Sequence, residues 1–157
     1  MRNYSIQIND YLERFIKNIL LYNKKGILLN GMTLSLVDLL LINYLGDNGN
    51  KKMFEVIEDL DIDRNSLVTL INRLQKKQLL GKVRSLRDRR TYILDLTPKG
   101  RNIYLQLLES EEKILSDLLG DFTFNEEKTI LKFLVKLDML NKAMTRDCDK
   151  LRYENGS

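Results

Sequence analysis

The sequence predicts a mainly α-helical protein with one small β-ribbon, and three observations support this class. Apolar residues recur at i, i+3, i+4 and i+7 along most of the 157 residues, as in helices that bury one face. Two runs near the middle, residues 79–84 and 91–96, have the composition of strands instead. The hydrophobic fraction of 43% is enough for a core, yet no run of about 18 apolar residues indicates a transmembrane helix.

The first two predicted helices are separated by a turn. The first covers residues 5–23, and its apolar stripe consists of Ile8, Tyr11, Leu12, Phe15, Ile16, Ile19 and Tyr22. The pair Asn30-Gly31 breaks the chain after it. The second helix, residues 34–44, is apolar almost all round, which is typical of a helix buried from several sides. Thr33 is its expected N-cap.

A tight turn joins the next two predicted helices. In the first, residues 52–60, the side chains expected to face inward are Phe54, Ile57 and Leu60. The turn Asp61-Ile62-Asp63 follows, and Asp63 can cap the next helix because an acid suits the positive end of the helix dipole. Two short helices joined by three residues, one of them apolar, indicate a helix-turn-helix.

The helix that begins after Asp63 is the candidate DNA-reading element. Its buried stripe is expected to be Leu67, Leu70, Ile71 and Leu74. The side chains left outside are short and polar or cationic, as in helices that reach base edges and phosphates. Those expected in the major groove are Arg64, Asn65, Ser66, Thr69 and Asn72. Arg73 and Lys76 are expected on phosphates.

The ribbon has a basic tip, Ser85 to Arg90, between its two strands. Arg87, Arg89 and Arg90 are candidates for the minor groove, whose negative potential attracts cations. Asp88 is expected to orient one of these arginines through a charge-assisted hydrogen bond.

Two further helices complete the chain. Thr97-Pro98 is a start signal, with Thr as N-cap and Pro at the first helical position, where its missing N–H costs nothing. This helix is expected to run to residue 119. Thr123 and Glu126 have capping-box spacing and start the last helix, which runs to about residue 148.

Charge is segregated along the chain. Residues 61–101 hold 11 Lys and Arg against 4 Asp, whereas the remaining residues hold 15 basic and 18 acidic groups. A charge of +7 on one segment and −3 on the rest is the pattern of a polyanion-binding face. The alternative, a solvated charged surface, would not predict this segregation.

Several classes of function are disfavoured. There is no His, and Cys148 is the single cysteine, so a Cys/His metal cluster and an intrachain disulfide are excluded and the commonest general base is absent. We expect no metal and no cofactor, and a structural or incidental Cys148 rather than a redox sensor. The N-terminus lacks the apolar segment of a signal peptide, so we expect a cytoplasmic protein without membrane contacts.

The ribbon carries a recognisable motif. Asp88-Arg89-Arg90 followed by Leu94-x-Leu96-Thr97 resembles the wing of MarR-family transcriptional regulators. Residues 60–63 and 72–77 resemble that family's turn and the end of its recognition helix, and the flanking helices match in order and length. The resemblance implies a winged helix-turn-helix homodimer that binds double-stranded DNA, with an effector site between its dimerisation and DNA-binding regions.

The same resemblance implies a division into three parts. Residues 1–32 would be an N-terminal dimerisation helix and linker, residues 33–97 the DNA-binding domain, and residues 98–157 the C-terminal dimerisation helices. Three residues depart from the family pattern. Asp61 and Gln78 stand where Gly is common, and Arg87 stands where an acid is frequent. A non-Gly residue at position 78 is expected to cost about 1 kcal/mol.

Two hypotheses of different classes follow. The first is a sequence-specific, homodimeric transcriptional regulator, a repressor on a pseudo-palindromic operator, with release by an unidentified small-molecule effector left open. The alternative is a winged-helix module that binds a protein, or binds nucleic acid without sequence preference. An enzyme is the weakest option, because the sequence contains no recognisable nucleophile–base pair or metal set.

Overall fold

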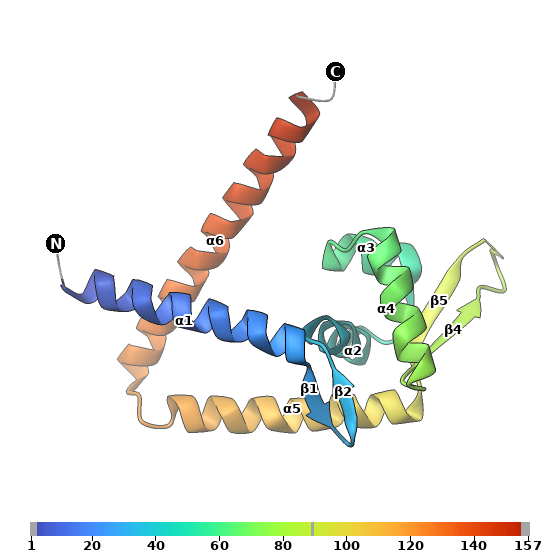
Figure 1. Cartoon of the computed structure of the whole chain (residues 1–157), viewed down its shortest axis with the longest axis horizontal. Coiled ribbons are helices and arrows are strands. Elements are labelled where there is room, and N and C mark those ends of the chain that lie inside the picture. Colours follow the sequence, from blue (N-terminus) through green and yellow to red (C-terminus); the bar gives the residue numbers. More distant parts are fainter. Residues whose placement is uncertain (1–2, 89, 155–157) are drawn as a thin grey trace. The chain divides into compact units, whose positions relative to one another are not determined.

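The helices and strands follow the order expected from the sequence, with three short strands added. The computed structural model describes residues 3–88 and 90–154, with the side chains of residues 4–21, 23–88 and 90–144. The elements are α1 (Asn3–Lys25), β1 (Ile27–Leu29), β2 (Met32–Leu34), α2 (Leu36–Asn48), β3 (Lys51–Lys52), α3 (Met53–Leu60), α4 (Arg64–Lys76), β4 (Leu80–Arg84), β5 (Tyr92–Leu96), α5 (Pro98–Leu119) and α6 (Phe124–Glu154) (Figure 1). The predicted class, mainly α with a small β-ribbon, is confirmed.

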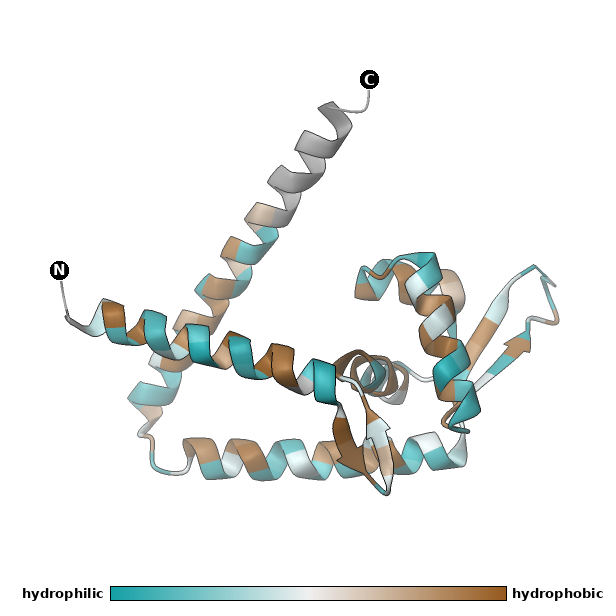
Figure 2. Ribbon diagram, in the orientation of Figure 1, coloured by the Kyte–Doolittle hydropathy of each residue, from teal (hydrophilic) through white to brown (hydrophobic). Residues whose placement is uncertain are grey.

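The chain divides into two units, Met1–Glu109 and Ser110–Ser157. The hydrophobic core lies in the first unit and is formed by side chains of α2, α3, α4, the β4–β5 hairpin and the start of α5. Helix α2 is apolar along most of its length (Figure 2), and Leu41, Ile42 and Leu45 are fully buried. The prediction that this helix is buried from several sides is therefore confirmed.

A β-hairpin that the sequence did not predict lies between α1 and α2. Asn30 and Gly31 both have positive φ, 48° and 73°, as the central residues of a two-residue type I′ turn require. Strands β1 and β2 pair on either side of them, with Thr33 opposite Leu28. The expectation that Thr33 is the N-cap of α2 is therefore wrong, because its backbone belongs to a strand.

Ser35 caps α2 instead. Its hydroxyl accepts the N–H of Asp38 at 3.1 Å, and the Asp38 carboxylate accepts the N–H of Ser35 at 2.8 Å. This reciprocal capping box satisfies two backbone donors that would otherwise be unpaired at the helix start.

The start of α3 also differs from the prediction. Lys51 and Lys52 form β3, which pairs with β5 opposite Leu94 and Ile93, so the helix begins at Met53. Met53 and Val56 of this helix are buried, whereas Phe54 is 50% exposed. The inward orientation predicted for Phe54 is wrong, and only Ile57 and Leu60 of that predicted set pack against the core.

The three-stranded sheet has the order β3-β5-β4, and all its pairs are antiparallel. Leu94 and Leu96 face the core of the first unit, as the alternation along β5 predicted. The register places Leu80 opposite Leu96 and Arg84 opposite Tyr92. The hairpin formed by β4, β5 and the loop between them is the wing of the winged helix.

A Schellman turn ends α4 and leads into β4. The N–H of Leu79 donates to the Leu74 carbonyl at 3.0 Å, and the N–H of Gln78 donates to Gln75 at 2.9 Å. Gln78 has φ 61°, in the left-handed region that this turn requires and that glycine adopts with the least strain. Asp61, at φ 50°, adopts the same conformation after α3, as expected for an acid in place of Gly.

Replacing Gln78 with Gly should stabilise the protein by about 0.5–1 kcal/mol, because the left-handed strain is removed while the carbonyl that Thr97 contacts remains. Thermal melting by circular dichroism would measure the change. The matched control is Gln75→Gly three residues earlier, where glycine in the helix interior should destabilise by a similar amount. Equal effects of the two substitutions would contradict this account of the turn.

The second unit consists of the end of α5 and α6. The N–H of Thr123 donates to the Glu126 carboxylate at 2.8 Å, as the capping-box spacing predicted, but the Thr123 hydroxyl donates to the same oxygen rather than accepting from the helix. These bonds, with the backbone bond first, hold the pKa of Glu126 below its ordinary value. The side chain of Cys148 lies outside the described residues.

Candidate nucleic-acid interface

Helix α4 is positioned by its cap and by its buried stripe. The Asp63 carboxylate accepts the N–H of Ser66 at 3.0 Å, and hydrogen bonds from the side chain and backbone of Ser66 lower the pKa of Asp63. The four predicted stripe residues are all buried against the core: Leu67, Leu70, Ile71 and Leu74. The predicted cap and the predicted buried stripe are both confirmed. Together, the cap and the stripe determine which side of the helix faces outward.

The outward side of α4 is continuous and polar. Asn65, Thr69, Asn72 and Lys76 lie at i, i+4, i+7 and i+11, opposite the buried stripe, and all four are exposed. The Thr69 hydroxyl donates to the Asn65 carbonyl at 3.0 Å, so its oxygen remains directed outward as an acceptor. We define these four residues as the outer face of α4.

Three other predicted contact residues flank this outer face. Ser66 and Arg73 lie toward the start of α2, and Arg64 lies on the opposite flank, toward the wing. All three are exposed, but Arg73 is engaged by a protein carboxylate. Its Nε and Nη2 donate to Asp38 at 2.8 and 2.7 Å. A DNA phosphate, the predicted partner of Arg73, would therefore compete with Asp38 for the same guanidinium group.

The loop at the tip of the wing is built by two polar residues. The Ser85 hydroxyl, in a buried residue, accepts the N–H groups of Arg87 and Asp88 at 3.3 and 3.4 Å. The Asp88 carboxylate accepts the N–H of Arg90 at 2.9 Å and the hydroxyl of Thr91 at 2.8 Å. These bonds, with the Arg90 bond first, lower the pKa of Asp88.

The partners of Asp88 that the structure describes are not arginine side chains, and the side chain of the adjacent Arg89 is not among the described residues. Within the described residues the Asp88 carboxylate bonds backbone and a hydroxyl. A short acid in a tight loop reaches the N–H two residues on more readily than a flexible guanidinium. Asp88 still orients the wing, but it does so by shaping the loop. Arg87 and Arg90 are exposed at the tip, and Arg89 lies outside the described residues.

Two cations on the wing were missed by the sequence interpretation. Lys82 and Arg84 of β4 both lie over the Tyr92 ring, with Nζ 4.2 Å and the guanidinium carbon 5.5 Å from its centroid. Arg84 Nε also donates to the Tyr92 hydroxyl at 3.2 Å. Arg84, and then Lys82, lower the pKa of Tyr92. The pairing of Arg84 with Tyr92 across the hairpin was the signal that could have identified them.

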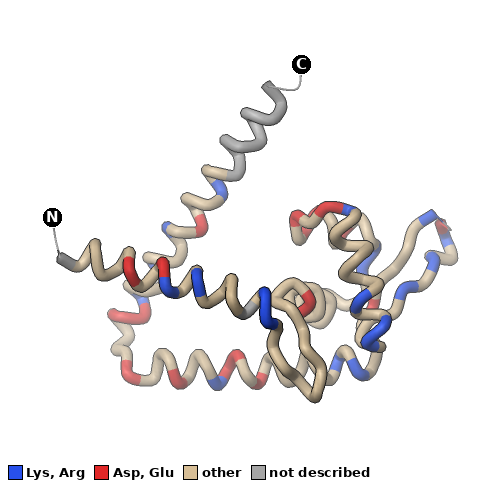
Figure 3. Tube along the Cα trace, in the orientation of Figure 1, with Lys and Arg blue, Asp and Glu red and all other residues tan. Residues whose placement is uncertain are grey.

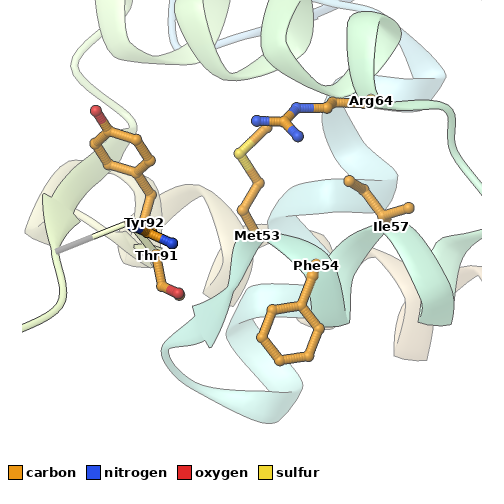
Figure 4. A pocket seen from close by; sticks show the side chains of 7 residues that line it. Met53, Phe54, Ile57, Arg64, Thr91 and Tyr92 are labelled. Atoms are coloured by element: carbon orange, nitrogen blue, oxygen red, sulfur yellow. The ribbon is translucent and has the colours of Figure 1, made fainter. Parts of the chain in front are cut away.

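Helix α4 and the wing thus present one cationic region of the first unit (Figure 3). A pocket of about 130 Å³ lies between α3, the start of α4 and the wing. In Figure 4, Arg64 enters it from α4 above Met53, while Phe54 and Ile57 approach from α3. Arg90 also lines this pocket. The pocket therefore has one predicted contact residue from α4, Arg64, and one from the wing, Arg90.

A recognised family contains this arrangement. The family model described as transcriptional regulator SarA/Rot matches residues 23–107, which is more than half of the chain. The chain belongs to the SarA/Rot family of transcriptional regulators. Residues 23–107 include the first hairpin, the helix-turn-helix, the wing and the start of α5. Membership of a family of transcriptional regulators supports the sequence prediction that the protein is not an enzyme.

Individual relatives and solved structures are also similar to this chain. The chain is 23% identical over 90 residues to the uncharacterized HTH-type transcriptional regulator YwhA of Bacillus subtilis (strain 168). The aligned residues cover 57% of this chain and 65% of YwhA. The aligned part is thus slightly less than two thirds of that relative.

Among solved structures, Streptococcus pneumoniae FabT in complex with DNA has a TM-score of 0.77 and 24% identity, over 89% of this chain and 99% of FabT. The crystal structure of MarR has a TM-score of 0.62 and 21% identity, over 87% and 94% of the two chains. These likenesses confirm for this SarA/Rot protein the MarR-like winged helix that the wing motif predicted. Among its described residues, none of the helices combines the length and hydropathy of a membrane span.

Proposed function

We propose that this protein is a sequence-specific regulator that binds double-stranded DNA as a homodimer and represses transcription from a pseudo-palindromic operator. The observation that carries the proposal is the continuous polar outer face of α4 beside a cationic wing. Such a helix suits the major groove, where base edges are distinguishable, while the wing suits the adjacent minor groove.

The proposed contacts combine both elements. Asn65 and Asn72 can each pair with an adenine edge through two hydrogen bonds. The other proposed contacts on α4 are Arg64, Ser66, Thr69 and Lys76, and those on the wing are Arg87, Arg89 and Arg90. All but Arg89, which the structure does not describe, are exposed. Lys76 is assigned to a phosphate because it lies at the end of the outer face.

Large apolar side chains that are exposed in the single chain support the dimer. On α1 they include Tyr11, Phe15, Ile16 and Leu20, and on α6 they include Leu131, Leu134, Leu140 and Met144. Exposed apolar surface on this scale is typical of a protein–protein interface. We therefore keep residues 1–32 and 98–157 as proposed dimerisation parts and residues 33–97 as the proposed DNA-binding part. A symmetric dimer would read two half-sites about one helical turn apart.

A dimer on such an operator would obstruct transcription, which is why repression is proposed rather than activation. The cytoplasmic location follows from the same proposal, because the operator would be there. A small molecule that releases DNA is a further part of the proposal, and its chemical identity is left open.

The test is selection of bound fragments from the source genome, followed by competition against unrelated duplexes at fixed salt. The selected duplex should bind about 10³-fold or more tightly than unrelated DNA. An equal response to every duplex would favour the alternative of a non-specific or protein-binding module. Repeating the selection with candidate small molecules would identify an effector through lost fragments.

A further inference from the structure

Asp38 is a buried carboxylate that touches the DNA-reading helix from outside it. It lies in the first turn of α2 and is 1% exposed. One oxygen accepts the N–H of Ser35 at 2.8 Å, and the other accepts two donors of Arg73 at 2.8 and 2.7 Å. Lys77 Nζ lies 3.9 Å from the first oxygen. Arg73 lies in the last turn of α4, and Lys77 is the C-cap residue of that helix.

A buried carboxylate is stabilised only when charged and hydrogen-bonding partners replace its water. Arg73 supplies a planar fork, which matches a carboxylate better than a lysine ammonium does. Arg73 Nη2 also lies 3.3 Å from the Ser35 hydroxyl. Arg73 is therefore held against the start of α2, although its side chain remains 43% exposed.

The end of α4 is tied to neighbouring elements at a second residue. Lys77 Nζ donates to the carbonyl of Thr33, the middle residue of β2. The Lys77 carbonyl accepts from Lys99 Nζ of α5 at 3.1 Å. These contacts and the Asp38 pair lie on one flank of the helix, beside the outer face rather than on it. They add to the restraint that the buried stripe places on the rotation of α4 about its own axis.

We propose that Asp38, acting through Arg73, is a positioning residue for DNA recognition, and that Arg73 is held as its partner rather than as a phosphate contact. This inference rests on the proposed function of α4. Readout of base edges requires side chains held within about 0.5 Å and 10–20° of the productive geometry. Loss of the Asp38–Arg73 pair would remove one restraint on α4, and even a small rotation of the helix would shift Asn65 and Asn72 out of register with the bases.

Positioning and phosphate contact predict different changes in specificity. A phosphate contact carries no sequence information, so its loss weakens binding to all duplexes about equally. A turned recognition helix weakens only the selected duplex. In Asp38→Asn, moreover, two cations lose their negative partner, so non-specific affinity should hold or rise. Partial unfolding would instead lower binding to both duplexes in proportion.

The decisive variant is Arg73→Lys. It keeps a cation for a phosphate but loses the fork that engages both Nε and Nη2 with Asp38. We expect affinity for the selected duplex to fall roughly tenfold while affinity for unrelated DNA stays within about twofold. Asp38→Asn should give the same loss of specificity, and the double variant Asp38→Asn/Arg73→Lys should lose little more, because the two residues act as one unit.

The matched control is Lys76→Gln on the outer face, measured over a salt series. It should weaken both duplexes and lower the slope of log affinity against log salt by about 0.9, whereas Arg73→Gln should leave that slope unchanged. The inference is overturned if Arg73→Lys binds the selected duplex like the wild type, or if Arg73→Gln lowers the slope as Lys76→Gln does. A wild-type protein without any duplex preference would instead refute the proposed function itself.

Discussion

Replacing Arg90 with Ala should weaken binding to the selected duplex by roughly 10–100-fold, the range expected when one specific cationic contact is lost. The side chain is exposed at the tip of the wing, where the minor groove would meet it. The loop should keep its shape, because Asp88 bonds the backbone N–H of Arg90, which alanine retains. The melting temperature should therefore stay the same.

Fluorescence anisotropy at several salt concentrations would measure this effect. Loss of one cation from the phosphate-lined groove should also lower the salt slope by about 0.9. The control Lys142→Ala removes the same charge from α6, where the ammonium pairs with Asp138 at 2.7 Å, and it should leave affinity nearly unchanged. Unaltered binding by Arg90→Ala would remove the wing from the proposed interface.

The sequence predicted α4 and the wing well because their signals are local. The four stripe residues of α4 share one helical phase, and Asp63 stands directly before them. Local patterns were less informative where an element is very short. Strand β3 has only two residues, Lys51 and Lys52, and pairing with β5 creates it. Missing that strand shifted the expected helix start by one residue. The orientation of Phe54 was a separate error of helical phase, because the buried residues of α3 include Met53 and Val56.

The exposure of the candidate site residues was predictable from the sequence, but their hydrogen-bonding partners were not. Exposure of the α4 residues follows from periodicity alone, since the buried stripe defines the opposite face. The pairing of Asp38 with Arg73 cannot be inferred from periodicity, because 35 residues separate them and only the packing of α2 on α4 brings them together. Similarly, the composition of the wing tip shows its charge, whereas the hydrogen bonds of Ser85 and Asp88 depend on the folded loop.

The junction between α4, β4 and α5 should be very sensitive to an added methyl group. A Cβ at Gly100 would lie 2.0 Å from the Leu79 carbonyl oxygen, and that oxygen also accepts the N–H of Thr97 at 3.1 Å. Because the obstacle is hydrogen-bonded backbone, it cannot rotate away as a flexible side chain could. Gly100→Ala should therefore destabilise the protein by about 1–3 kcal/mol or more.

For a chain of this length, that loss corresponds to a melting temperature lower by on the order of 5 °C. The control is Gly81→Ala, where the nearest heavy atom to a Cβ is the Asp95 carbonyl oxygen at an ordinary 3.7 Å, so stability should change little. The Gly100 variant should also bind the selected duplex less well, because Leu79 directly follows the turn that ends α4. If it melted like the wild type, α5 could move away from Leu79 without disturbing the core, and the rigid junction described above would be wrong.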